Sequence, residues 1–177
     1  MAGHVMLDLE TLGKGDRAAI ISIGAVKFDP AGVGVESGFY VNVDAESAQA
    51  YGLQIDASTV MWWLHADREV ARRALLESTP VGLAEALDGF ADWFGTDSLP
   101  TWGNGATFDN IITRNAFAAV GRDLPWKFWD DRCYRTLKNL APALKLERVG
   151  TYHNALDDAT SQALHMQAIV AHLGLVL

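Results

Sequence analysis

An apolar stretch near the N-terminus, residues 5–11 (Val-Met-Leu-Asp-Leu-Glu-Thr), predicts a β-strand that carries two acids. Side chains alternate between the faces of a strand, so Asp8 and Glu10 share one face while Leu7 and Leu9 share the other. Two carboxylates on one face of an apolar, central strand repel each other and are costly to bury. A bound divalent cation would remove that cost, whereas a solvated edge strand or a turn beginning at Thr11 explains the pair without an ion.

The length of 177 residues suits one hydrophobic core, and we expect a single domain over residues 1–177. Half of the residues are apolar and a fifth are charged, as in a globular protein. No apolar run approaches the roughly 20 residues that cross a bilayer, and the N-terminus does not resemble a secretory signal. We therefore expect no membrane partner. The single cysteine, Cys133, excludes an intramolecular disulfide and predicts a cytoplasmic location.

The net charge of −8 and the isoelectric point near 4.9 argue against an unspecific clamp on duplex nucleic acid. Such a clamp needs a broad basic face. A polyanionic substrate must therefore be held locally. Metal ions can do this, because each ion neutralises a cluster of acids and then attracts phosphate.

The hydrophobic pattern predicts an α/β fold. Strands are expected at 5–11, 18–28 and 38–43, joined by turns into an antiparallel meander, and two more at 99–102 and 126–129. Helices are expected at 58–77 with a break at Asp67, from the Thr79-Pro80 start to Phe94, and at 108–120, 131–140 and 155–173. This order indicates a mixed sheet, three antiparallel strands then two parallel ones, flanked by α-helices. Ligands gather beyond the carboxyl ends of the central strands in such sheets, where Asp8 and Glu10 lie.

A second acid, Asp109, follows the expected fourth strand and falls in the first turn of a helix. An acid there ordinarily complements the helix dipole. Gly103 and Gly105 favour a functional interpretation, because they remove side chains from the approach to Asp109.

The third acidic segment is Tyr-His-Asn-Ala-Leu-Asp-Asp-Ala at residues 152–159. His153 precedes the last helix and Asp158 lies in its opening turns, as a general base beside a metal ligand would require, although a lone histidine is usually structural. Asp157 is expected to be solvated. Four carboxylates together would raise one another's pKa, whereas two hard cations would turn them into a phosphodiester-cleaving site.

These three segments resemble the motifs of the DEDDh family of 3′-to-5′ exonucleases, which have the ribonuclease H-like fold. The first is Asp-Leu-Glu at residues 8–10, and the second is Asn-Gly-Ala-Thr-Phe-Asp at 104–109. The third, His-Asn-Ala-Leu-Asp-Asp at 153–158, fits H-x-A-x-x-D. The likeness covers nearly the whole chain, and within the family it is strongest to RNase T-like and exonuclease VIII-like proteins of bacteria and phages.

The resemblance implies a metal-dependent 3′-5′ exonuclease that hydrolyses single-stranded ends or 3′ overhangs to nucleoside 5′-monophosphates. Two Mg²⁺ or Mn²⁺ ions would be bridged by Asp8, with Glu10 and Asp158 on the first ion and Asp109 reaching the second. His153 would deprotonate the attacking water. Related exonucleases are often homodimers in which one subunit lends basic residues to the other, so a homodimer is also expected.

Substrate contacts are expected from side chains beside the acids. The resemblance implies that Leu9, Thr11 and Leu12 grip the terminal nucleotide, and the further candidates are Trp63, Asn104 and Phe108. Trp62 and Trp63 are adjacent and cannot share a helix face, so one should be core and the other exposed. The aromatic side chains expected in the core are Trp126, Phe128 and Trp129.

Two alternatives stay open at this point. One is a catalytically silent nucleic-acid-binding module of the same fold, against which the five intact motif residues speak. The other is a metal phosphatase acting on small phosphoesters. The sequence leaves RNA and DNA undecided, because no residue can be assigned to the 2′-hydroxyl.

Overall fold

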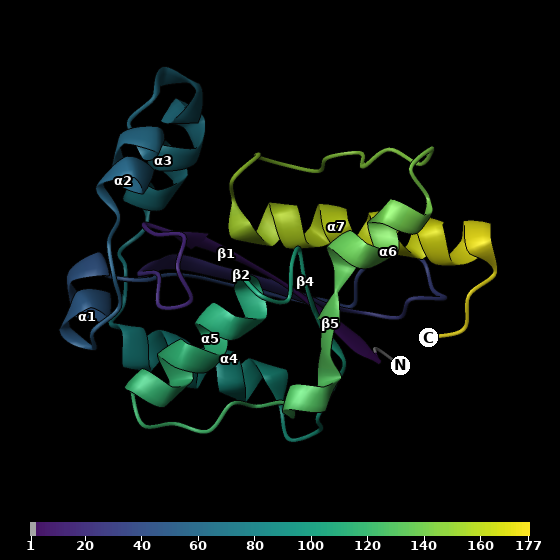
Figure 1. Ribbon diagram of the computed structural model, residues 1–177, viewed down its shortest axis with the longest axis horizontal. Helices are drawn as coiled ribbons and strands as arrows, with labels where there is room; N and C mark the ends of the chain where they lie inside the picture. Colours follow the sequence, from purple (N-terminus) through teal and green to yellow (C-terminus); the bar gives the residue numbers. More distant parts are fainter. Residues whose placement is uncertain (1–2) are drawn as a thin grey trace.

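The computed structural model describes residues 3–177 and contains one five-stranded sheet (Figure 1). Its strands lie in the order β3-β2-β1-β4-β5. Strand β2 pairs antiparallel with both β1 and β3, whereas β4 pairs parallel with both β1 and β5. The predicted mixed sheet is therefore confirmed. The strands are β1 His4–Thr11, β2 Ile20–Phe28, β3 Ser37–Asn42, β4 Thr101–Gly103 and β5 Asp131–Cys133.

Helices cover both faces of this sheet (Figure 1). The helices α6 and α7 lie on one face and α4 and α5 on the other, while α2 and α3 form a hairpin that projects beyond the sheet. Short 3₁₀ turns occur at Ala66–Arg68 and Phe128–Asp130. The α-helices are α1 Ala45–Ala50, α2 Ala57–Trp63, α3 Glu69–Glu77, α4 Leu83–Phe94, α5 Asp109–Ala119, α6 Tyr134–Leu140 and α7 Ala155–Leu173. Within residues 3–177, none of these helices is both long and apolar enough to cross a membrane.

The alternation of side chains along β1 divides the core into two clusters. Leu7 and Leu9 pack with residues of α4 and α5, whereas Met6 packs with residues of α6 and α7. Asp8 and Glu10 are on the Met6 face because they are two and four positions further along the strand. The strand therefore turns both acids toward α7.

The close approach of α7 depends on a glycine directly opposite the first acid. Gly24 of β2 pairs with Asp8 of β1. A Cβ atom at Gly24 would lie 2.1 Å from the carbonyl carbon of Ala155, at the start of α7. Ala155 and Ala159 are fully buried, as expected for small residues at a tight helix–sheet contact. This contact brings the opening turn of α7 beside the acids of β1.

The fifth strand and the aromatic residues before it differ from the prediction. The strand is at Asp131–Cys133 rather than 126–129, so the next helix begins at Tyr134 rather than 131. Trp126 is buried, as predicted, but Phe128 and Trp129 are 68% and 62% exposed. The prediction for these two is wrong because the segment turns through a 3₁₀ helix, which carries their rings to the surface.

Several helix boundaries also differ. Helix α1 was not predicted, because its sequence Ala-Glu-Ser-Ala-Gln-Ala has no apolar stripe; its N-cap Asp44 accepts a hydrogen bond from the amide of Glu46. The helix expected from Thr79-Pro80 begins at Leu83, after Gly82. The helix expected at 58–77 is interrupted around Asp67, as predicted, by the 3₁₀ turn between α2 and α3.

Candidate active site

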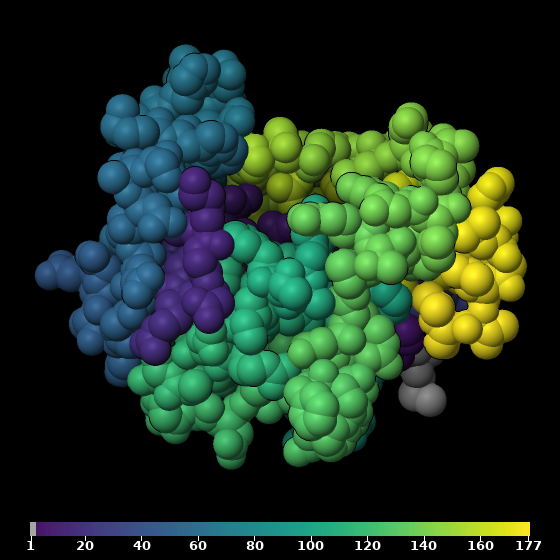
Figure 2. All heavy atoms as spheres, in the orientation of Figure 1, coloured from purple at the N-terminus to yellow at the C-terminus, as the bar shows by residue number. Residues whose placement is uncertain are grey.

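The four predicted acids and His153 line one hollow of about 320 Å³ at the carboxyl end of β1. Figure 2 shows this recess between the blue α2–α3 hairpin, the olive start of α7 and the green segment around α6. Asp8 and Glu10 reach it from the strand, Asp109 from α5 and Asp158 from α7. The fold therefore brings together carboxylates that are up to 150 positions apart in the chain.

Asp109 is held at the N-terminus of α5 by backbone contacts. The amide of Leu9 donates a hydrogen bond to Asp109 Oδ1 at 3.2 Å, which ties the carboxylate to β1. A Cβ atom at Gly103 would come within 2.8 Å of Asp109 Cβ, and Gly105 adopts a φ of +117°. These glycines thus permit a close helix approach and a tight turn, rather than clearing the entrance as the sequence suggested.

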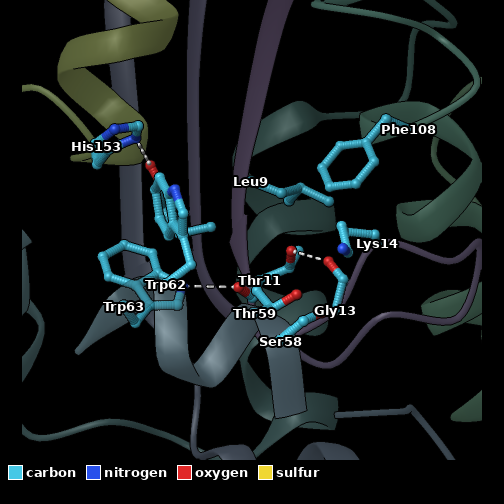
Figure 3. Close-up of a pocket in the computed structure, with 11 residues that line it drawn as sticks. Leu9, Thr11, Gly13, Lys14, Ser58, Thr59, Trp62, Trp63, Phe108 and His153 are labelled. Carbon is cyan, nitrogen blue, oxygen red and sulfur yellow. Dashed lines mark hydrogen bonds and ion pairs between the residues drawn. The ribbon is translucent and has the colours of Figure 1, made fainter. Parts of the chain in front are cut away.

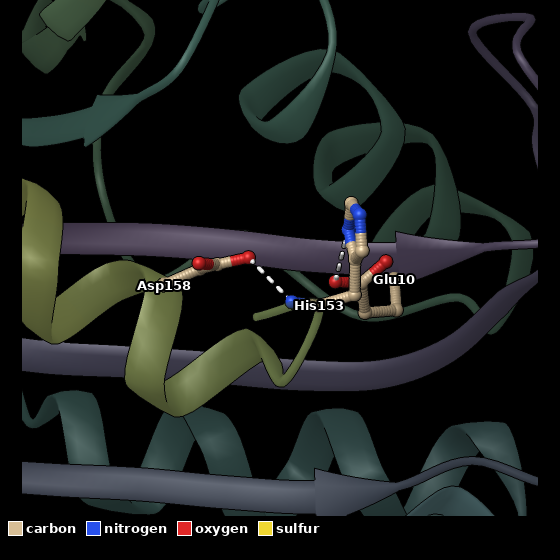
Figure 4. A group of neighbouring side chains, drawn as sticks. All are labelled: Glu10, His153 and Asp158. Atoms are coloured by element: carbon tan, nitrogen blue, oxygen red, sulfur yellow. Dashed lines mark hydrogen bonds and ion pairs between the residues drawn. The ribbon is translucent and has the colours of Figure 1, made fainter. Parts of the chain in front are cut away.

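Asp158 is positioned by the first turn of α7. The N-cap Asn154 accepts hydrogen bonds from the amides of Leu156 and Asp157, which starts the helix at Ala155. The amide of His153 donates to Asp158 Oδ2 at 3.1 Å (Figure 4). Asp157 was expected to be solvated, but it accepts a hydrogen bond from the amide of Thr151 at 2.6 Å and so orders the preceding loop.

His153 is the one described non-glycine residue with a left-handed backbone, at a φ of +64°. Its Nδ1 lies 3.8 Å from Glu10 Oε1 (Figure 4). The ring stacks on Tyr152, with centroids 3.7 Å apart, and meets the edge of Trp62 at 4.9 Å. This packing holds the imidazole against the acids, and such a strained backbone is typical of functional positions.

The surroundings oppose charge on all five groups. Burial raises the pKa of Asp8 well above its usual value, and the neighbouring Asp109 and Glu10 add to this. Burial and the carboxylate of Asp158 raise the pKa of Glu10 to about 8. Burial likewise raises the pKa of Asp109 to about 7 and that of Asp158 above its ordinary value. The pKa of His153 is lowered to about 4 by burial and then by Arg68 and Arg148, so its imidazole is neutral at pH 7.

Two contacts of these acids were not predicted. Gln162 Nε2 donates a hydrogen bond to Asp8 Oδ1 at 2.7 Å, and its position four residues after Asp158, on the same helix face, is a signal that could have revealed it. Arg148 forms an ion pair with Asp158 and stacks on Tyr152, with its guanidinium 3.7 Å from the ring centroid. Arg148 lies in a loop, and no spacing rule connects it to Asp158.

The hollow fits divalent cations. Ligand atoms of Glu10, His153 and Asp158 lie within 4.8 Å of one another, and the remaining donors are carboxylate oxygens, which Mg²⁺ and Mn²⁺ prefer. Three buried polar atoms around it have no hydrogen-bond partner among the described residues: Asn104 Oδ1, His153 Nε2 and Gln162 Oε1. Unpartnered polar groups and mutually repelling acids together favour a site completed by ions and water.

A second hollow of about 350 Å³ adjoins the first and shares its Glu10 and His153 walls. Among the predicted substrate contacts, the ones lining it are Leu9, Thr11, Trp63 and Phe108 (Figure 3). Asn104 lines the acidic hollow instead. Leu12 faces neither, because it lines a separate apolar groove beside α2 and α3.

The two adjacent tryptophans divide as expected, one core and one exposed. Trp63 is 5% exposed, and its indole Nε1 donates a hydrogen bond to the carbonyl of Thr11 at 2.9 Å (Figure 3). Trp62 is 39% exposed and also lines the second hollow. Trp62 therefore offers more ring surface to a ligand than Trp63.

Solved structures with this fold include exonucleases. The chain matches E. coli exonuclease I in complex with a dT13 oligonucleotide with a TM-score of 0.67 at 15% identity, covering 97% of this chain and 41% of that chain. It matches the nuclease domain of 3′hExo, a DEDDh family member bound to rAMP, with a TM-score of 0.64 at 14% identity, covering 96% and 92%. At these identities the likeness shows a common fold. The chain spans less than half the length of exonuclease I.

The sequence is similar to that of known exonucleases. The exodeoxyribonuclease of Enterobacteria phage T4 is 24% identical over 157 residues, which cover 74% of this chain and 68% of the phage protein. A model of the Rv2179c-like 3′-5′ exoribonuclease domain matches residues 3–170. These matches define a 3′-5′ exonuclease, which confirms the predicted class. The chain belongs to the Rv2179c-like 3′-5′ exoribonuclease domain family.

Proposed function

We propose that residues 1–177 act as one exonuclease domain that removes nucleotides from the 3′ ends of single-stranded nucleic acid or 3′ overhangs. The products are nucleoside 5′-monophosphates. The observation that carries this proposal is the convergence of Asp8, Glu10, Asp109 and Asp158 with a neutral histidine around one hollow. The printed descriptions of the relatives support it, since exonuclease I is bound to an oligonucleotide and 3′hExo to rAMP.

The residues that would hold two Mg²⁺ or Mn²⁺ ions are Asp8, Glu10, Asp109 and Asp158. Their charges are poorly compensated by the protein, since Arg148 is the one cation in contact with them among residues 3–177. When bound, such ions would neutralise the charge of the phosphodiester and activate a water molecule for attack.

His153 suits the role of general base. Its pKa of about 4 leaves the imidazole unprotonated at neutral pH, so it can accept a proton from water. Among residues 3–177 its Nε2 has no hydrogen-bond partner, whereas Nδ1 lies 3.8 Å from Glu10 Oε1. The stacking on Tyr152 and the edge contact with Trp62 limit rotation of the ring, which keeps Nε2 oriented.

The adjoining hollow suits the terminal nucleoside. Its wall is mainly apolar, with Leu9 and Phe108 on one side and Trp62 on the other (Figure 3). Aromatic and aliphatic side chains bind any base by stacking, at about 1–3 kcal/mol per base, which agrees with removal of nucleotides irrespective of sequence. Trp63 has little exposed surface for a base. It would instead position Trp62 through their edge contact and Thr11 through the hydrogen bond to its carbonyl.

The test is a panel of 3′-labelled single-stranded RNA, single-stranded DNA and duplexes with 3′ overhangs, each with Mg²⁺, Mn²⁺ or EDTA. We expect release of 5′-mononucleotides from the single-stranded ends, abolished by EDTA, and the relative rates will assign RNA or DNA. A protein that binds these strands without cleaving them would be a silent module. Faster cleavage of a chromogenic phosphomonoester than of any oligonucleotide would indicate a phosphatase.

Location and assembly are further parts of the proposal. We place the enzyme in the cytoplasm because its one cysteine, Cys133, is a free thiol. We propose a homodimer because the α2–α3 hairpin exposes apolar side chains, namely Met61, Leu64, Val70 and Leu76. Sedimentation showing monomer alone at working concentration would remove the dimer.

A further inference from the structure

Positive charge is concentrated in one segment of this acidic chain. Residues 132–148 hold five of the 14 lysines and arginines but one of the 22 acids. The segment comprises most of β5, helix α6 and the loop that leads toward α7. A local basic segment is what an acidic protein needs in order to hold a polyanion.

Among residues 3–177, four of these five basic groups form no ion pair with an acid: Arg132, Arg135, Lys138 and Lys145. The last three of these also line a hollow, so they are available to a ligand there. Arg135 and Lys145 are exposed, and each donates a hydrogen bond to a backbone carbonyl. Arg135 and Lys138 are three residues apart in α6 and therefore share a helix face.

The basic groups line two hollows that share a wall. Arg135 and Arg148 line the acidic hollow that holds the catalytic candidates. Lys138 and Lys145 line a separate hollow of about 350 Å³ between α6 and the following loop. Leu146 lines both, so the hollow of Lys138 and Lys145 lies beside the acidic hollow.

We propose that this series, Arg135, Lys138 and Lys145, binds the phosphates of the single strand on the 5′ side of the scissile bond. The inference rests on the proposed function, because the acidic hollow fixes where the 3′ end lies. Arg135 then contacts the phosphate nearest that hollow, and Lys138 and Lys145 contact phosphates further from the end. The binding is independent of sequence, since these side chains meet the backbone, and it requires no second subunit.

Substrate length is the variable that tests this proposal. The probes are 5′-fluorescein-labelled oligouridylates and oligothymidylates of two and six nucleotides with phosphorothioate linkages, and the readout is Kd by anisotropy. We expect the hexamer to bind at least about tenfold more tightly than the dimer. Lys138→Ala with Lys145→Ala should remove most of this gain. It should also lower the slope of log Kd against log salt by about 1.4, at about 0.7 per phosphate contact.

Two matched variants control for net charge and for folding. Arg122→Ala with Lys127→Ala also removes two positive charges, outside the basic segment, and should keep the length dependence. Lys138→Arg with Lys145→Arg should keep it as well. Equal losses in the Arg122/Lys127 and Lys138/Lys145 alanine variants would overturn the proposal. So would a hexamer that binds no better than a dimer to an enzyme that does release mononucleotides, whereas failure to release them would overturn the proposed function itself.

Discussion

The acids of the hollow are the residues with the most unusual chemistry. Each has a raised pKa because burial opposes its ionisation, and for Asp8 and Glu10 the neighbouring acids of the hollow add to this. A protein gains no stability from such an arrangement, so the cluster is explained by what it binds. Burial also disfavours the charged form of His153, but for a histidine this lowers the pKa, so the side chain is uncharged.

Substitution of single acids should separate catalysis from folding. Asp8→Asn and Asp158→Asn should each lower kcat on a single-stranded substrate by several orders of magnitude, because a metal ligand is lost while the shape is kept. His153→Ala should cost about 10²- to 10⁴-fold, as for a general base. Asp123→Asn, an exposed acid away from the site, is the matched control. Near-normal turnover by Asp8→Asn, with an unchanged circular dichroism spectrum, would contradict the assignment.

Substitution of Arg148 should change the affinity for metal ions, because its guanidinium and a metal ion compete for Asp158. Arg148→Ala should tighten Mn²⁺ binding by up to about fivefold, the equivalent of about 1 kcal/mol for a partly exposed ion pair. Isothermal titration calorimetry measures this directly, with Lys127→Ala as the control. Weaker Mn²⁺ binding in Arg148→Ala would show that the arginine supports the ion rather than replacing it.

At the scale of elements, the site depends on how closely α7 lies against β2. Gly24 permits that approach, and any side chain there collides with the backbone of Ala155. Gly24→Ala should therefore lower the free energy of unfolding by about 1–3 kcal/mol, the usual cost of overpacking. Urea denaturation tests this against Gly15→Ala, where a Cβ atom would meet nothing within 4 Å. Equal stability of the two variants would contradict the proposed contact.

An element could be predicted from the sequence where its own residues carry a hydrophobic pattern. Strand β1 and helices α5 and α7 carry their own patterns, and the acidic motifs lie at the end of β1 and at the starts of α5 and α7, so the catalytic candidates could be named in advance. Strand β5 has three residues and is defined by pairing with β4, which no local pattern records. The role of Arg148 comes from a tertiary contact, as does the burial of Trp63 rather than Trp62, whereas the spacing of Gln162 from Asp158 is a local signal.

For the whole molecule, the buried acids predict an unusual pH dependence of stability. Glu10 and Asp109 have pKa values of about 8 and 7 when folded, above the ordinary 4.5 and 3.8, so the folded state binds more protons than the unfolded state between these limits. Stability in EDTA should therefore fall as the pH rises from about 6.5 to 8.5. His153 contributes little in this window, because its effect lies below pH 6.5.

Thermal unfolding across this range checks the prediction. In EDTA the Tm should decrease with rising pH, and in excess Mg²⁺ the decrease should disappear, because the ions bind the ionised acids and displace their protons. The Asp8→Asn variant, with one acid fewer, should show a smaller decrease in EDTA. A Tm in EDTA that rises over the same range would mean that these acids are well compensated by the protein.

The proposed exonuclease activity depends on whether the gathered carboxylates bind a pair of ions in solution. Titration of the protein with Mn²⁺ at about pH 8, with free Mn²⁺ followed by electron paramagnetic resonance, measures this without any substrate. We predict saturation at two ions per chain, and loss of at least one in Asp8→Asn. No saturable binding, or the same stoichiometry and affinity in Asp8→Asn, would contradict the central claim.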